Sequence, residues 1–441
     1  MRIDAERGKK VAKVIGRLPY VSTDVRMAEL IGVGKVEFSK WKNDGEKIPV
    51  HKERRFYDIA QIEPGWLELS LEKLEAQLEA NPYHEHPEAW NPPRTPTPFI
   101  GRDKELKLIK NKIGVFFGKN GSESNILSIH GVPGVGKSTV AAWLANDPEI
   151  LMVFSDAVLW STFGQLTGNV SDLDFQACER LTSWGGLLGD EYMSKAMQVN
   201  ELTERVENLL QKRRALLICD DVWDIDHVIS IRRLADRGVY ILFTSRFTDI
   251  AHKLAADASN VIELKGFNES DAIKLLKTIA PDVVARYPSE TEALVRDLEY
   301  LPLAINVAGH LLRRELAAGL NVISMIDELR NEGEQLLQEA LPPDMVELIR
   351  EAKSPTVAAW LMRSIRVLDK PTRDFFISLG SMAAKPATFG LRELKMRWGD
   401  RTKVIIRKLV DTGLVQTTTD QRYQMHALLV TLARSMRTQG Q

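Results

Sequence analysis

The feature that most constrains the fold of this chain is the segment GVPGVGKST at residues 131–139. It fits the phosphate-loop pattern G-x-x-x-x-G-K-[ST], in which glycines allow backbone amides to face phosphate oxygens and a following helix adds its positive dipole end. The pattern predicts that Lys137 bridges the β and γ phosphates and that Ser138 binds Mg²⁺. The predicted nucleotide contacts are Gly131, Gly134, Val135, Gly136, Lys137, Ser138 and Thr139.

Short apolar runs alternate with helical stretches on both sides of this motif. Strands that alternate with helices favour a parallel, doubly wound sheet, so the sequence predicts an α/β P-loop NTPase fold. The predicted strands lie within residues 125–132, 157–163, 215–222, 239–245 and 260–266.

Two of these predicted strands end in polar residues. Asp220 and Asp221 close the run ALLICDDV, and Arg246 follows ILFTS. Ligand sites of α/β sheets lie at the carboxyl ends of the strands. We expect Asp220 to hold Mg²⁺ through water and Asp221 to orient or deprotonate the attacking water. Arg246 would reach the γ-phosphate, so Asp221, Arg246 and Lys137 are the predicted catalytic residues.

A proline-rich segment at residues 81–98 marks a domain boundary, since it holds six of the 19 prolines. Proline lacks the amide donor that helices and sheets require, so we expect a semi-rigid linker. The segment before it has helical patterns, strands alternate with helices from residue 125 to 265, and helical periodicity returns from 268. We therefore predict a helical domain at residues 1–80, before the linker.

The N-terminal segment resembles Cro/repressor-type helix-turn-helix domains over roughly residues 5–70. Ser22 or Thr23 caps a predicted helix, Gly32 and Gly34 make a turn, and a second helix begins near Lys35. The start of that second helix enters the major groove in such domains. Phe38 and Trp41 are expected to pack inward. The predicted DNA-reading residues are Lys35, Glu37, Ser39 and Lys40.

Two features of this segment leave alternatives open. Many small helical domains share the pattern, so a protein-interaction module is the alternative to DNA binding. A leucine stripe at residues 67, 71, 74 and 78 could pair two subunits or pack against its own domain.

Six ordered motifs between residues 98 and 437 resemble the NB-ARC signalling ATPases. The resemblance implies a nucleotide domain at 99–266, a helical ARC domain at 267–350 and a winged-helix domain at 351–441. It also implies tight ADP binding, exchange to ATP with Mg²⁺, and nucleotide-dependent homo-oligomers. The motifs are FIGRDKEL at 99–106, the phosphate loop, LLICDDVW, ILFTSR, LPLA at 301–304 and MHALL at 425–429.

The resemblance also assigns residues to the nucleotide. Phe99, Ile100 and Arg102 would contact adenine, Pro302 would pack on the base, and His426 would touch the β-phosphate of ADP.

The chain departs from the family pattern at two positions. Tyr300 stands where the family usually has glycine, so the local backbone is expected to differ or the alignment to slip by one residue. Ala427 replaces the aspartate of the Met-His-Asp motif, which predicts a weaker ADP lock or a substitute for it.

Charge is distributed unevenly along the chain. The whole chain has 59 basic and 60 acidic residues. Residues 1–60 have 14 basic and 9 acidic residues, and residues 391–441 have 10 basic and 4 acidic residues. The region between them has 35 basic and 47 acidic residues, so two basic ends flank an acidic centre. The family resemblance favours an intramolecular role for the basic C-terminal region. The alternatives are contact with DNA and electrostatic docking on the acidic centre.

The chain has only two cysteines, a charged N-terminus and no long apolar stretch. These features predict a cytoplasmic protein with no membrane partner. If it binds DNA, we expect it to be associated with the nucleoid. Our leading interpretation is a DNA-binding transcriptional regulator switched by ATP and ADP, with slow hydrolysis and double-stranded DNA as partner. Its inducer or protein effector is unknown. One alternative is an NLR-like defence signalling ATPase. Another is an ATPase that assembles on DNA to target or load other machinery.

Overall fold

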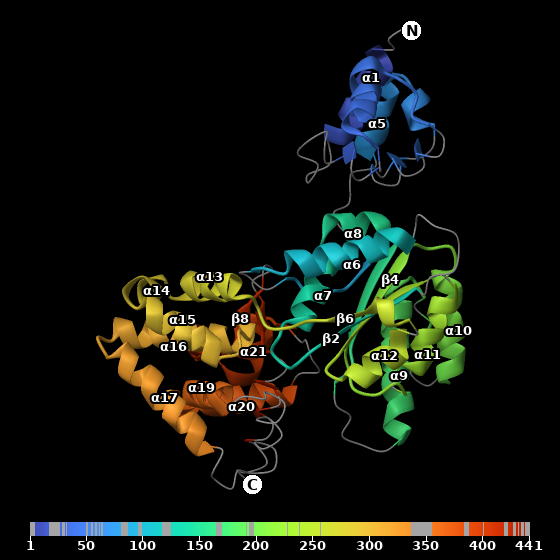
Figure 1. Cartoon of the computed structure of the whole chain (residues 1–441). Helices are drawn as coiled ribbons and strands as arrows, with labels where there is room; N and C mark the ends of the chain where they lie inside the picture. The colour runs from blue at the N-terminus through green and yellow to red at the C-terminus, as the bar shows by residue number, and fades with distance from the viewer. Residues whose placement is uncertain are drawn as a thin grey trace. The chain divides into compact units, whose positions relative to one another are not determined.

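The structure is a computed structural model of the chain, and it describes most but not all residues (Figure 1). The chain forms two compact units. Unit 1 contains Met1–Trp90, Ala145–Val158 and Lys212–Ala215, and unit 2 contains the rest. The described residues are 5–16, 27–28, 31, 33–49, 52–53, 56–57, 60, 62, 65–80, 87–95, 99–116, 125–164, 170–190, 192–193, 198–226, 228–237, 239–255, 257–336, 355–382, 388–399, 401–418, 422–426, 429–430, 432–433 and 436.

The N-terminal part of unit 1 is helical and has its own apolar core. Phe38 and Trp41 are buried in it, which confirms that they pack inward. Leu67 and Leu74 are buried in the same core and Leu78 packs against it, so the leucine stripe packs on its own domain. The helix-turn-helix assignment itself stays a prediction. The elements are α1 (Ala5–Gly16), α3 (Lys35–Ser39), η1 (Lys40–Asp44), η2 (Trp66–Glu68) and α5 (Leu71–Ala80).

A six-stranded sheet in the order β1-β3-β4-β5-β2-β6 carries the phosphate loop. Its pairs β2·β5, β2·β6 and β4·β5 are parallel, and all five predicted strands are present. Every residue of β2, β4 and β5 is buried, because helices cover both faces of such a sheet. The strands are β1 (Ala89–Trp90), β2 (Ile126–His130), β3 (Ala157–Thr162), β4 (Ala215–Val222), β5 (Tyr240–Ser245) and β6 (Val261–Glu263).

The strand β1 was not predicted, because it lies inside the segment predicted to be a linker. Ala89 and Trp90 pair in parallel with Ala157 and Val158, and Ala89 is buried. Residues 81–86 and 96–98 of the predicted linker lie outside the described residues. At least part of the segment therefore belongs to the sheet.

Helices follow the strands in the order expected for alternating strands and helices. Helix α7 begins at Lys137, directly after the phosphate loop. The helices of this region are α6 (Asp103–Phe116), α7 (Lys137–Ala145), α8 (Pro148–Val153), α9 (Val170–Leu187), α10 (Val199–Leu210), α11 (Ile229–Arg232), η3 (Arg233–Arg237), α12 (Thr248–Ala255) and η4 (Ala258–Asn260).

A helical group follows the sheet, as the return of helical periodicity predicts (Figure 1). Helix α16 is its centre, with nine buried residues, and it contacts α13, α14, α17 and α19. The group comprises α13 (Glu269–Ile279), α14 (Pro281–Arg286), α15 (Pro288–Asp297), α16 (Pro302–Ala317) and α17 (Val322–Leu336).

The C-terminal region contains helices and a three-stranded antiparallel sheet in the order β7-β9-β8. The strands β8 and β9 follow α22 in the chain, and the winged-helix assignment remains a prediction. None of the helices that the structure describes is long and apolar enough to cross a membrane. The elements are α19 (Pro355–Arg366), α20 (Lys370–Met382), β7 (Thr388–Phe389), α21 (Leu391–Trp398), α22 (Thr402–Asp411), β8 (Gln416–Thr417) and β9 (Tyr423–Gln424).

Candidate nucleotide-binding site

The phosphate loop has a backbone that only glycines adopt without strain. Gly131, Gly134 and Gly136 have φ of 152°, 83° and 100°. A Cβ on Gly131 would lie 2.3 Å from the carbonyl oxygen of Leu264. The glycines are thus required by geometry, as the motif predicts, and the loop leads straight into α7.

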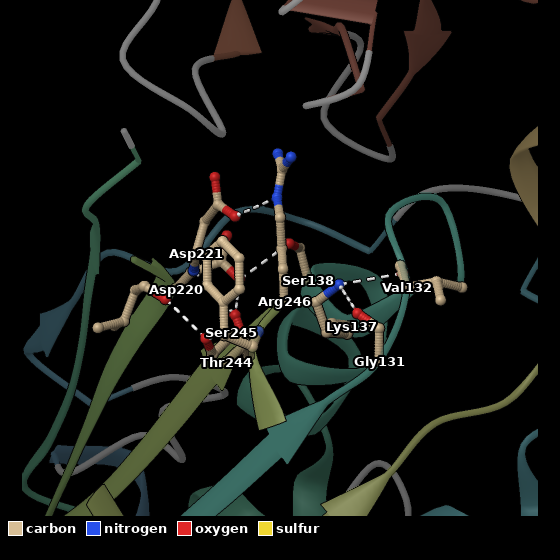
Figure 2. A network of polar contacts seen from close by, with 11 residues as sticks. Gly131, Val132, Lys137, Ser138, Asp220, Asp221, Thr244, Ser245 and Arg246 are labelled. Atoms are coloured by element: carbon tan, nitrogen blue, oxygen red, sulfur yellow. Dashed lines mark hydrogen bonds and ion pairs between the residues drawn. The ribbon is translucent and has the colours of Figure 1, made fainter. Parts of the chain in front are cut away.

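The predicted magnesium ligands are brought together by three elements (Figure 2). Ser138 at the start of α7 donates a hydrogen bond of 2.8 Å to Oδ1 of Asp220 on β4. Thr244 on β5 donates to the same oxygen at 2.5 Å and accepts a bond of 2.9 Å from the amide of Asp221. Strand β5 lies between β2, which leads into the phosphate loop, and β4, which carries Asp220 and Asp221. Thr244 on β5 is therefore placed next to both.

Two of these groups have electrostatic properties that suit a cation and a phosphate. Burial, together with the neighbouring Asp221, raises the pKa of Asp220 to about 6, against the opposing hydrogen bonds from Thr244 and Ser138. The Lys137 ammonium donates to the carbonyl oxygens of Gly131 and Val132, at 2.8 and 3.2 Å. A buried carboxylate that is costly to ionise alone is stabilised by a cation, and the hard oxygens of Ser138 and Asp220 fit Mg²⁺.

Asp221 and Arg246 form a buried ion pair beside this cluster. Nε of Arg246 lies 3.1 Å from Oδ1 of Asp221, and both side chains are almost fully buried. The guanidinium also lies 4.6 Å from the centre of the Trp223 ring, and Phe247 meets that ring edge-on. Asp221 has φ of 55°, at a point where the β4·β5 register shifts. The strained backbone turns this carboxylate toward Arg246.

A cavity of about 270 Å³ next to the phosphate loop collects the residues predicted to bind the base. Arg102 is buried, and it donates to the Val135 carbonyl at 2.8 Å and lies over the Phe267 ring. The amide of Leu303, the second residue of α16, donates to the Gly134 carbonyl at 3.3 Å. The predicted residues in this lining are Phe99, Ile100, Arg102, Gly134, Val135, Gly136, Thr139, Pro302 and His426.

A smaller cavity of about 50 Å³ lies at the phosphate end. Lys137, Ser138, Asp220, Asp221 and Arg246 line it. The C-terminal region contributes Gln416, Gln424, Met425 and His426 to the same lining. Gln416 and His426 line both cavities, so His426 lies where the two cavities meet, and its contact with a phosphate stays a prediction.

The two family departures have different outcomes. Tyr300 has φ of 54°, the left-handed conformation that glycine adopts most easily, and Glu299 before it has φ of 51°. Its carbonyl accepts from the Phe267 amide at 2.9 Å and its amide donates to Val295. The chain thus keeps a glycine-like backbone with a tyrosine, at a cost of about 1–2 kcal/mol. Ala427 lies outside the described residues.

Sequence reasoning missed three contributors to the site. The first is Thr244. Its position, as a polar residue near the end of a buried strand, was the signal that could have identified it. The others are His310 and Arg313 on α16, which line the larger cavity. Burial, aided by Arg313, lowers the pKa of His310 to about 4. These two residues are separated in sequence from every recognised motif.

The predicted DNA-reading residues lie in unit 1. Lys35, Glu37 and Lys40 are exposed and Ser39 is half-buried. The nucleotide cavities are lined entirely by residues of unit 2.

Comparison with known proteins identifies the family of the central region. Residues 107–284 match the family model of the NB-ARC domain. Human apoptotic protease-activating factor 1 is 24% identical over 353 residues, which is 77% of this chain and 26% of that protein. A putative late blight resistance protein homolog from Solanum demissum is 30% identical over 165 residues, covering 35% of this chain and 19% of that protein. The chain therefore spans about a quarter or less of these relatives.

Among solved structures, a signal transduction ATPase with a tetratricopeptide repeat sensor from Pyrococcus horikoshii has a TM-score of 0.47 at 16% identity. The match covers 79% of this chain and 44% of that one. The family match, together with the phosphate loop and its acidic strand, shows that residues 107–284 of this chain carry an NB-ARC domain, a P-loop ATPase module.

Proposed function

We propose that this chain is a nucleotide-operated signalling switch of the NLR-like kind. ADP would hold a closed form, and exchange to ATP would open it and allow copies to assemble. Hydrolysis would be slow and would reset the switch. The observation that carries this proposal is the joint lining of the phosphate cavity by the phosphate loop and by Gln416, Gln424, Met425 and His426 of the C-terminal region.

The proposed roles follow from the geometry. Lys137 would leave its loop carbonyls for the phosphates, since an ammonium prefers charged oxygens to neutral ones. Ser138 and Asp220 would hold Mg²⁺, which when bound neutralises phosphate charge. Asp221 would orient water, and Arg246 would exchange its bond to Asp221 for the γ-phosphate. This exchange would make the Asp221–Arg246 pair the part of the site that distinguishes ATP from ADP.

The base and the remaining phosphate have their own proposed contacts. Phe99, Ile100 and Arg102 would contact adenine, Pro302 would pack on the ring, and His426 would reach the β-phosphate of ADP. All five residues line the same cavity, which supports these assignments.

The matched relatives favour this function over the transcriptional regulator that the sequence first suggested. By their names, they are a protease-activating factor of apoptosis and resistance proteins of plants. One observation supports the transcriptional regulator: Lys35, Glu37 and Lys40 are exposed on one short helical segment. We therefore keep DNA binding by unit 1 as the second candidate.

The test is the mass of the full chain with ADP and with a non-hydrolysable ATP analogue. We expect one protomer with ADP and a larger species with the analogue. Lys137→Ala should lose nucleotide binding by about 100-fold or more, since it removes a charged partner of the phosphates, and should stay at one mass. Lys104→Ala, an exposed lysine of α6, is the matched control. An analogue that binds without changing the mass would contradict the switch.

A further inference from the structure

The structure exposes a basic surface on α21 and α22 that the nucleotide site does not use. Six cations lie on these two helices and the turn between them, and all six are exposed. None of them forms an ion pair with any residue in the described part of the chain, although Arg397 lies over the Trp398 ring. They are Arg392, Lys395, Arg397, Arg401, Lys403 and Arg407.

The two helices form a compact pair joined by a tight turn. Gly399 ends α21 with φ of 75°, and α22 begins at Thr402. Thr402 is fully buried, and its hydroxyl donates to the Gly399 carbonyl at 2.6 Å. The inner faces bury Leu394, Ile406 and Leu409, which fixes the remaining faces toward solvent.

Apolar side chains are exposed among the cations. Met396 is 77% exposed and Val404 is 61% exposed. Along α22, Arg407 lies four residues after Lys403 and three residues after Val404, so it neighbours both of them on the helix surface. The surface is therefore mainly cationic, with single apolar side chains among the charges, and its charge suits a polyanionic partner.

The acidic residues that the structure describes on this pair do not cancel the surface; Asp400, between the two helices, lies outside the described residues. Glu393 accepts three hydrogen bonds of 3.1 to 3.2 Å from the Arg422 guanidinium, and a fourth bond from the Gly390 amide. The Gly390 and Arg422 contacts lower the pKa of Glu393. Lys408 is neutralised by its ion pair with Asp369, and Asp411 lies at the far end of α22. The first two turns of α22 are therefore positive.

We propose that α21 and α22 form a contact surface for double-stranded DNA, separate from unit 1. Two helices joined by a short glycine turn can place the second helix in a major groove, which admits one α-helix. The six exposed cations would contact phosphates, and Val404 would face a thymine methyl group. The antiparallel pair β8 and β9 follows α22 directly in sequence. This inference does not depend on the proposed switch.

The experiment measures the affinity of the full chain for a fluorescent 20-base-pair duplex across a series of salt concentrations. We expect Lys403→Glu/Arg407→Glu to weaken binding at least tenfold. We also expect the slope of log affinity against log salt to fall by about two, one for each lost phosphate contact. Lys104→Glu/Lys107→Glu on α6 changes the net charge equally and should leave both quantities within twofold.

Two further arms make the result decisive. If Lys35→Glu/Lys40→Glu abolishes binding and Lys403→Glu/Arg407→Glu does not weaken it, the contact belongs to unit 1 and the proposal fails. A labelled polyglutamate peptide is the probe for an acidic protein partner. If it binds as tightly as the duplex, or if the duplex does not bind at all, the surface is not a DNA contact. Retained ADP binding shows that the α22 and α6 variants are folded, and an unchanged far-ultraviolet circular dichroism spectrum shows it for Lys35→Glu/Lys40→Glu.

Discussion

Thr244 shows how one side chain organises the phosphate end of the site. Its hydroxyl donates to Asp220 and accepts from the Asp221 amide, so it fixes both acidic residues at once. The unusual φ of Asp221 makes this support necessary, because a strained residue persists only when its surroundings hold it.

We predict that Thr244→Val lowers the rate of ATP hydrolysis by about tenfold or more and leaves ADP binding within a few-fold. Valine keeps the shape but leaves a buried amide unpaired, which costs about 1–3 kcal/mol. Single-turnover hydrolysis is the measurement. Thr244→Ser is the control and should retain most of the activity. Normal hydrolysis by a folded Thr244→Val protein would contradict the role.

Trp223 sets the position of Arg246 in the same region. Its ring lies against the guanidinium, and Asp221 holds Nε. We predict that Trp223→Leu weakens the preference for an ATP analogue over ADP by about threefold to tenfold, because a cation–π contact is worth roughly 0.5–2 kcal/mol. Competition binding measures the ratio. Trp223→Phe keeps an aromatic face, so its ratio of affinities should lie between those of the natural chain and Trp223→Leu. An unchanged ratio in Trp223→Leu would exclude this role.

The motifs predicted the candidate phosphate and Mg²⁺ residues from sequence but not the side chains that support them. Lys137, Ser138 and Asp220 were predictable because phosphate and Mg²⁺ chemistry restricts which residues can serve and at what spacing. Thr244 was not assigned, because threonine is also an ordinary strand former and its place near the end of a buried strand does not say which groups its hydroxyl contacts. Contacts made across strands depend on strand order, which a linear pattern does not contain.

At the scale of elements, helix α16 connects the nucleotide cavity with the C-terminal region. Asn306 donates to the Gly413 carbonyl at 3.3 Å, and a Cβ on Gly413 would lie 2.9 Å from the His310 ring. His310 therefore lies in a confined space beside Arg313, where a positive charge is disfavoured.

We predict that acid destabilises this region through His310. Its pKa is about 4 when folded and about 6.5 otherwise, so the unfolded chain binds the proton first as the pH falls. This contribution to stability is complete above 6.5, is lost between 6.5 and 4, and changes no further below 4. Melting temperature against pH should be flatter in His310→Gln than in the natural chain. His252→Gln, which replaces an exposed histidine, should behave like the natural chain, and equal slopes in all three proteins would rule this out.

The predictability of elements depended on their length. The runs that became β2 to β6 were found because they are apolar and flanked by helical stretches. The strand β1 has two residues, too few to show alternation, and it lies among prolines that favour a linker. Tyr300 was expected to change the local backbone, yet its hydrogen bonds hold a conformation typical of glycine.

At the scale of the whole molecule, the two units should respond differently to nucleotide. All the residues that line the two nucleotide cavities belong to unit 2. A ligand that binds only the folded form stabilises that form by about 2.7 kcal/mol at a concentration 100 times its Kd. We predict that ADP increases protection from hydrogen exchange in unit 2 and leaves α1 and α5 unchanged. Equal protection of both units would show that they unfold together.

The joint lining of the nucleotide cavities also has a kinetic consequence. A nucleotide that filled both cavities would contact Gln416 and His426, since these two residues line both of them. Its departure would then wait for the C-terminal segment to move, so the residence time would be set by a conformational rate rather than by affinity alone. Such a protein would act as a timer, in which the interval between exchange events is determined by the opening of its own chain.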